Sequence, residues 1–126
     1  MSQDIVADAL NMIRNAKKAK KESLKIERIS KLFIEVLKIM KREGAIKKYK
    51  IDPKNRGVEI ALGDFFECKA IKPRFTVKKD QIEKYRRRYL PARDIGIIVL
   101  TTNRGLITHE EALKEGLGGS LIAYFY

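Results

Sequence analysis

The stretch from Thr101 to Gly105 carries the side chains best suited to bind a polar ligand. Thr101, Thr102 and Asn103 lie at the predicted end of a strand, and Arg104 and Gly105 follow in a turn. Hydroxyl and amide groups donate and accept hydrogen bonds, so these side chains can bind a base edge, a ribose or a phosphate. Gly105 suits the left-handed residue that closes a three- or four-residue hairpin loop.

A pair of glycines, Gly118 and Gly119, comes shortly before the last predicted strand. Because glycine has no side chain, another backbone can approach it very closely. The polar turn beside this pair indicates an RNA clamp. It is equally typical of an ordinary hairpin in which the glycines serve only backbone geometry, and the motif alone does not separate the two.

The same stretch fits no common enzyme motif. The sequence GLGGS lacks the Lys-Ser/Thr of a phosphate-binding loop, and the position four residues after His109 is Leu113, not a second zinc-binding histidine. Cys68 and His109 are the only cysteine and histidine, so neither a four-ligand zinc site nor a hydrolytic triad is supported. We therefore predict no enzyme activity, no metal, no cofactor and no small-molecule substrate.

The composition points to a polyanionic partner. The 126 residues include 28 Lys and Arg against 16 Asp and Glu, which gives a net charge of +12. Such an excess repels itself in the folded state, so nucleic acid is the first candidate and an anionic membrane the second. A solvated lysine-rich surface is the alternative. The longest purely aliphatic run, Ile97–Leu100, is far too short to span a membrane, and we expect no secretion signal.

Basic residues are concentrated between Lys69 and Arg93. Ten Lys and Arg oppose only Asp80 and Glu83 in this segment, a net charge of +8 as ten minus two. Arginine groups match phosphate geometry, and a tyrosine ring can stack on an unpaired base. The alternative is that the tyrosines pack in the core and the arginines face solvent. The candidate RNA-binding residues here are Lys72, Arg74, Arg86, Arg87, Arg88 and Tyr89.

The spacing of apolar residues predicts an α+β fold of two small lobes. Residues 1–63 indicate the order helix, strand, helix, strand, strand. In the first helix, over 4–18, one face is predicted to be apolar, with Asp4 as a possible cap. That face comprises Ile5, Ala9, Met12, Ile13 and Ala16. Ser30 is the expected N-cap of the second helix, and Gly44 is its expected stop.

Residues 64–126 predict a mainly β lobe with one short helix. The run 94–102 is apolar on both faces, which is typical of a central buried strand, and 121–126 indicates another strand. Thr108 and Glu111 form a capping box for the short helix, which Gly116 ends. Periodicity does not decide whether 79–89 is helical or irregular.

Several long segments together resemble one family, small-subunit ribosomal protein eight in its archaeal and eukaryotic form. DIVADALNMIRNA and SKLFIEVLKIMKREG are similar to its first two helices. RRYLPARDIGIIVLTTNRG, and THEEALKEGLGG followed by LIAYFY, are similar to its C-terminal half. The resemblance covers almost the whole chain. It implies a two-lobed α+β structural protein of the small subunit of the cytoplasmic ribosome, and a primary binder of the central domain of small-subunit rRNA.

The resemblance also implies which residues contact RNA. In the family, a Ser/Thr-Thr-Ser-x-Gly turn of the C-terminal lobe contacts an irregular, partly unpaired core in rRNA helix twenty-one. The matching positions are Thr101, Thr102, Asn103 and Gly105, and the family's glycine pair is Gly118 and Gly119. The family's N-terminal helix and the lysines after it contact neighbouring rRNA. Here these are Asp4, Asp8, Asn11, Arg14, Asn15, Lys17 and Lys18.

The family further implies contacts with small-subunit ribosomal proteins five and seventeen. Some members repress their own operon by binding an mRNA that mimics the rRNA site, so a regulatory mRNA binder or RNA chaperone is the alternative function. This chain departs from the family pattern at a few positions. Asn103 stands where serine is usual, Ile107 where methionine is usual, and Lys69 where glycine is usual. Arg28 and Ile29 replace a usual Pro-Ala pair.

Overall fold

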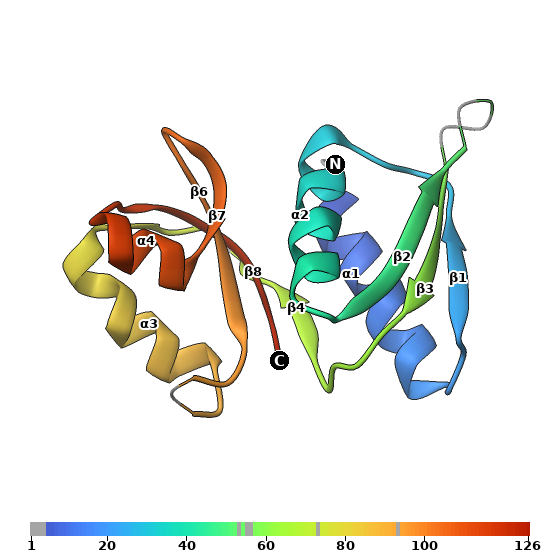
Figure 1. Ribbon diagram of the computed structural model, residues 1–126, viewed down its shortest axis with the longest axis horizontal. Helices are drawn as coiled ribbons and strands as arrows, with labels where there is room; N and C mark the ends of the chain where they lie inside the picture. Colours follow the sequence, from blue (N-terminus) through green and yellow to red (C-terminus); the bar gives the residue numbers. More distant parts are fainter. Residues whose placement is uncertain (1–4, 53, 55–56, 73, 93) are drawn as a thin grey trace. The chain divides into compact units, whose positions relative to one another are not determined.

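The computed structural model describes residues 5–52, 54, 57–72, 74–92 and 94–126. The chain forms two compact units, Met1–Lys69 and Ala70–Tyr126. Helices and antiparallel strands occur in the described part of both units (Figure 1), which confirms the predicted α+β class. Asp4, the expected cap of the first helix, lies outside the described residues.

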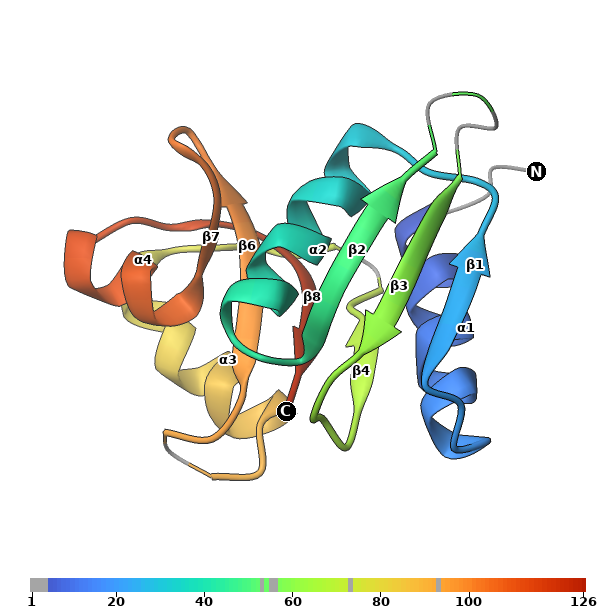
Figure 2. The ribbon, with the colours of Figure 1, turned by 45° about the vertical axis from the view of Figure 1, so that its right-hand side comes forward.

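The first unit follows the predicted order of elements. These are α1 (Ile5–Lys18), β1 (Ser23–Ile26), α2 (Lys31–Arg42), β2 (Ile46–Ile51) and β3 (Val58–Leu62). The strands form an antiparallel sheet in the order β1-β3-β2 (Figure 2). α1 contacts β1 and α2 contacts β2, while the two helices also contact each other. The sheet therefore buries one face beneath the helices and leaves its lysine-bearing face in solvent.

The buried stripe of α1 differs from the predicted one. Val6, Leu10 and Ile13 are buried, whereas Met12 is 44% exposed. Helical spacing explains the difference, because residues three and four apart share a face and Leu10 lies within this spacing of Val6 and Ile13. The prediction that Met12 faces the core was wrong. Ala9 and Ala16 are buried as expected, and Ile5 is half-buried.

Both predicted ends of α2 are confirmed. The Ser30 hydroxyl accepts a hydrogen bond from the Phe33 backbone amide at 3.1 Å, which satisfies one of the free amides of the first turn. Gly44 follows the helix with φ of +88°, a left-handed conformation that glycine adopts without a steric penalty. Between these ends, Phe33, Val36 and Leu37 are fully buried.

The first unit extends to Lys69 rather than ending at Gly63, where the sequence predicted the lobe boundary. Side chains of α1 hold the additional segment. Lys17 Nζ donates a hydrogen bond to the Gly63 carbonyl at 2.6 Å, and Arg14 forms an ion pair with Glu67. Burial raises the pKa of the Cys68 thiol to about 12. The thiol donates a hydrogen bond to the Leu10 carbonyl at 3.5 Å. Cys68 is therefore a protonated packing residue at neutral pH.

The second unit contains more helix than the sequence predicted. Its elements are β5 (Thr76–Val77), a 3₁₀ turn η1 (Lys79–Gln81), α3 (Ile82–Tyr89), β6 (Ile97–Thr102), β7 (Gly105–Thr108), α4 (His109–Glu115) and β8 (Gly119–Phe125). β4 (Cys68–Ala70) crosses the boundary between the units. The undecided segment 79–89 is thus helical, and α3 contacts α4 (Figure 1).

β6 is the central buried strand of this unit, as its apolar run predicted. The sheet has the order β4-β8-β6-β7, and β5 also pairs with β8, through Thr76–Ser120 and Val77–Gly119. Ile98, Leu100 and Leu121 are fully buried in the core between the sheet and the helices. Ile107, one of the departures from the family pattern, packs against the same core.

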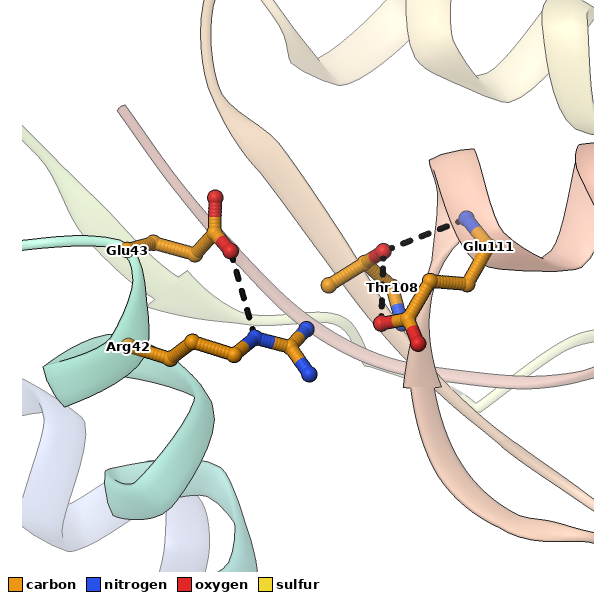
Figure 3. Close-up of polar contacts among 4 residues, drawn as sticks. All are labelled: Arg42, Glu43, Thr108 and Glu111. Atoms are coloured by element: carbon orange, nitrogen blue, oxygen red, sulfur yellow. Dashed lines mark hydrogen bonds and ion pairs between the residues drawn. The ribbon is translucent and has the colours of Figure 1, made fainter.

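His109 ties the start of α4 to β6. Its Nδ1 accepts a hydrogen bond from the Ile98 backbone amide at 3.1 Å, which requires that Nδ1 carry no proton. The predicted capping box is confirmed beside it, because Thr108 Oγ1 accepts from the Glu111 amide at 3.3 Å and the Glu111 carboxylate accepts from the Thr108 amide at 3.3 Å. Figure 3 shows this pair, and also the separate Arg42–Glu43 ion pair at the end of α2.

The buried imidazole predicts a loss of stability in mild acid. Burial lowers the pKa of His109 below its ordinary value near 6.5, so the unfolded chain binds a proton there at a higher pH than the folded chain does. The stabilisation is fully present above pH 6.5 and decreases as the pH falls below it. Urea unfolding from pH 7.5 to 5.5 should show a decrease in unfolding free energy that His109→Asn lacks. An identical pH dependence in that variant would contradict this role of His109.

Candidate nucleic-acid interface

The polar turn Thr101–Gly105 joins β6 to β7. Thr102 pairs with Gly105 in the ladder, so Asn103 and Arg104 form the tip. Gly105 has φ of +98°, which confirms the left-handed residue predicted at this position. The Thr102 hydroxyl donates to the Gly105 carbonyl at 3.0 Å and accepts from the Arg104 amide at 3.1 Å. Thr102 therefore shapes the turn, and its hydroxyl keeps one free acceptor position.

Asn103 occupies the exposed tip of this turn. Within the part of the chain that the structure describes, its side chain has no hydrogen-bond partner. It is not among the residues with positive φ, because Gly105 takes the left-handed conformation. Arg104, also exposed, lies 3.8 Å from the Glu115 carboxylate, an exposed ion pair of the kind that contributes little. The amide of Asn103 is thus free to bind a ligand without a change in the turn.

The glycine pair accommodates the protein's own backbone. A Cβ at Gly119 would lie 2.1 Å from the Thr101 carbonyl oxygen, and a Cβ at Gly118 would lie 2.4 Å from the Val77 carbonyl oxygen. Real side chains do not reach such distances, so β8 could not pair closely with its neighbours if either residue were larger. The backbone-geometry explanation accounts for both glycines. They bring the polar turn, β8 and β5 together.

This close packing places three hydroxyl side chains side by side, an arrangement that the sequence did not predict. Thr76 pairs with Ser120, and Ser120 pairs with Thr101, so the three side chains share one face of the sheet. The Thr76 and Ser120 hydroxyls are 3.2 Å apart. We name Thr76, Ser120 and Thr101 the hydroxyl row. Thr101 was predicted as part of the polar turn, Ser120 carried a weaker signal because it directly follows the glycine pair, and Thr76 carried none.

The three arginines of α3 do not share one role. Arg86 is only 11% exposed, and its Nε donates to both Glu83 carboxylate oxygens at 3.0 and 3.1 Å. Arg87 and Arg88 are exposed, and the Arg88 guanidinium lies 5.6 Å from the centre of the Tyr89 ring. Only Arg87 and Arg88 therefore present cations that can reach a phosphate.

Tyr89 belongs to a ladder of stacked rings. Its ring centre lies 6.4 Å from that of Tyr85 and 5.2 Å from that of Tyr124, and the ladder continues to Phe75 and Tyr126. These rings pack against the core of the second unit, as the alternative interpretation predicted. A base could stack on Tyr89 only by displacing a neighbour in this ladder. Lys72 and Arg74, in the segment before β5, are exposed.

The predicted RNA-contacting face of α1 is divided in the same way. Asp8, Asn11, Asn15 and Lys18 are exposed to solvent. Arg14 and Lys17 instead hold the segment that follows β3, and the Lys17 ammonium also lies 5.5 Å from the centre of the Phe65 ring. Asp4 falls outside the described residues.

The described residues offer no metal site and no membrane-spanning helix. Among the described residues, no three or more His, Cys, Asp or Glu side chains are placed to hold a metal ion. In the same residues, every helix is too short or too polar to cross a membrane. The features that could bind a ligand in the second unit are thus the polar turn, the hydroxyl row and the exposed cations.

Comparison with known proteins gives a consistent result over the whole chain. A family model described as ribosomal protein S8 matches residues 4–126. The small ribosomal subunit protein uS8 of Nanoarchaeum equitans is 45% identical over 129 residues, which span 100% of both chains. The proteins of the same name from Thermoplasma acidophilum and Archaeoglobus fulgidus are 42% and 40% identical, again over 100% of both chains.

The position of Gly119 predicts a packing role rather than a direct RNA contact. Gly119→Ala should lower the unfolding free energy by about 1–3 kcal/mol, because the added methyl group forces β8 away from Thr101. Ser120→Ala is the matched control, since it changes the adjacent residue without adding bulk. Urea unfolding of both variants measures the difference. Unchanged stability in Gly119→Ala, together with a loss of RNA affinity, would show instead that RNA needs the bare backbone.

Proposed function

We propose that this chain, which belongs to the ribosomal protein S8 family, holds the central domain of small-subunit rRNA by binding an irregular helix core. Membership makes the chain a structural component of the small subunit of the cytoplasmic ribosome and not an enzyme. Binding to rRNA agrees with the family and with the net charge of +12. The observation that carries the proposal is the Asn103 amide at the tip of a turn that other residues shape, since this amide has no partner among the described residues.

The proposed specificity comes from the second unit. Asn103 offers one carbonyl acceptor and two amide donors, and the hydroxyl row adds groups that both donate and accept. An irregular helix exposes base edges and 2′-hydroxyls that a regular A-form helix hides or repeats. Polar groups fixed on a sheet and a tight turn can therefore select such a core.

The proposed affinity comes from exposed cations. Arg87 and Arg88 on α3, with Lys72 and Arg74 before β5, are placed in solvent, where they can reach phosphates. In the first unit, Asn11, Asn15 and Lys18 lie on the exposed face of α1 and are proposed to contact neighbouring rRNA. Phosphate contacts of this kind position the protein but carry no sequence information.

The proposed partners beyond rRNA are small-subunit ribosomal proteins five and seventeen. An mRNA segment that folds like the rRNA site would present the same groups to the polar turn, so repression of the protein's own operon needs no second surface. Competition between the rRNA hairpin and such an mRNA for one molecule of protein would test this.

Binding to a central-domain rRNA hairpin should depend on salt without being wholly electrostatic. Neutralising about five phosphates predicts a slope of about −4 in log K against log salt. A titration from 50 to 400 mM KCl, with a plain duplex of equal length as the control, measures the slope and the preference. A slope near zero, or equal affinity for both RNAs, would contradict the proposal.

Asn103 should contribute to affinity for the cognate RNA and little to stability. Asn103→Ala should weaken cognate binding by about 1–3 kcal/mol, the cost of leaving a buried polar partner unpaired. Asn103→Ser, which restores a donor and an acceptor, should recover much of the loss. The melting temperature should change little, because the side chain lies at an exposed loop tip.

The control for Asn103 is a hairpin with a regularised core. If Asn103 only shaped the turn, both variants would lower the melting temperature and weaken all RNAs alike. If Asn103→Ala bound the cognate hairpin as tightly as the unsubstituted chain, the contact would be refuted.

A further inference from the structure

Phe66 presents an aromatic ring to solvent in the first unit. It is 89% exposed, whereas Phe65, the residue before it, is 6% exposed. A single exposed apolar side chain needs no explanation by itself. The surroundings of Phe66 suggest a function for its exposure, because the loop that carries the ring is held in place by hydrogen bonds and lies beside a pocket lined by lysines.

The backbone is fixed on both sides of Phe66. Before it, the Gly63 amide donates to the Ala45 carbonyl at 2.9 Å and the Asp64 amide donates to the Gly44 carbonyl at 3.2 Å. After it, Glu67 is paired with Arg14, and the Cys68 side chain is fully buried against α1. The ring is therefore held outward by an ordered loop, which is the arrangement that a stacking platform requires.

A pocket of about 570 Å³ opens beside this loop. Four lysines line it, Lys17, Lys20, Lys21 and Lys47, against the carboxylates of Glu22 and Asp64. Among the described residues, the ammonium groups of Lys20, Lys21 and Lys47 have no hydrogen-bond or ion-pair partner. Asp64 is two positions before Phe66, so the Cα atom of Phe66 lies within about 7 Å of the Cα atom of this pocket-lining residue. One nucleotide spans a comparable distance between its base and its phosphate.

The backbone at Lys20 is strained in a way that favours a role for its side chain. The Lys21 amide donates to the Ala16 carbonyl and the Lys20 amide to the Lys17 carbonyl, both at 3.0 Å, which closes α1 with a Schellman motif. In this motif the left-handed position is usually glycine, yet Lys20 occupies it with φ of +62°. The chain thus keeps a cation where glycine would be more stable.

We propose that Phe66 stacks on an unpaired RNA base while the lysine pocket binds a phosphate of the same strand. The occupant is single-stranded RNA, because the cations select a polyanion and an exposed ring accepts any base. This inference rests on the proposed function, RNA binding, but uses residues of the first unit instead of the polar turn. The first unit would thus bind an unpaired RNA strand, in addition to the phosphate contacts proposed for α1.

The test uses the whole chain, which contains no tryptophan. Phe66→Trp therefore places the only tryptophan of the chain at the proposed platform. Adding an unstructured eight-nucleotide adenine-rich RNA should quench its emission in a saturable manner. The same strand with abasic sites should bind more weakly and should not quench. Ile51→Trp is the matched control, since Ile51 is also exposed but lies at the opposite end of β2 from Lys47.

Further variants separate the contribution of the Phe66 ring from that of the lysines. Phe66→Ala should weaken binding of the single strand by about five- to 150-fold, the range for losing one stacked base, whereas Phe66→Tyr should retain it. Changing Lys20, Lys21 and Lys47 together to alanine should weaken binding and flatten its salt dependence. Lys20→Gly should raise the urea midpoint and still weaken binding, a combination that a merely structural lysine would not produce.

The inference is overturned if the strand does not quench Phe66→Trp, or if Phe66→Ala binds it as tightly as the unsubstituted chain. It is also overturned if Phe66→Ala changes only the concentration-dependent sedimentation of the protein, which would assign the ring to a second copy of the chain. Asn103→Ala separates this outcome from the proposed function. Unchanged hairpin affinity in Asn103→Ala, together with saturable quenching of Phe66→Trp, rejects the polar turn alone. A loss of hairpin affinity in Asn103→Ala without any quenching of Phe66→Trp rejects the Phe66 platform alone.

Discussion

The second unit depends on the contact between β8 and β6 at Gly119, where the two backbones leave no room for a side chain. A Cβ there would meet the Thr101 carbonyl oxygen at 2.1 Å. This closeness sets Ser120 opposite Thr101, and β5 then sets Thr76 opposite Ser120. Three hydroxyls that are far apart in the sequence reach one face only because two glycines come first. The surface that we propose for RNA therefore depends on the close approach of the β8 and β6 backbones.

The other edge of β6 is fixed by different means. His109 accepts from the Ile98 amide, and the Thr108–Glu111 capping box starts α4 directly after β7. The open end of the β6–β7 hairpin is thus held by buried or mutually satisfied groups. The conformation of the tip depends on Thr102 and Gly105, so the side chain at position 103 is not needed to form the turn. A serine-to-asparagine change at such a position can alter the contact without altering the turn.

Features set by neighbours in the sequence were predictable, and features set across the fold were not. Ser30, Thr108, Gly105 and Gly116 act on residues within four positions, so capping and turn rules identified them. The exposed Met12, the buried Arg86 and the ring ladder around Tyr89 depend on what lies opposite each side chain. The opposite burial of the neighbours Phe65 and Phe66 is likewise set by the fold, because an ordered loop holds the second ring in solvent. The candidate site was therefore predictable as a set of residue types, and only partly as an arrangement.

The distinction matters most for the basic residues. Composition counts 28 Lys and Arg as equivalent charges. In the fold, Arg14 and Arg86 neutralise carboxylates, and Lys17 donates to a carbonyl while lying over a ring. A cation already paired in this way releases few counterions when RNA binds, because its charge is compensated before the encounter. The electrostatic part of RNA affinity is thus set by the cations that the fold leaves in solvent, such as Arg87, Lys18 and Lys47. The count of 28 Lys and Arg bounds the number of such cations from above, and the tertiary structure decides how far below this bound it falls.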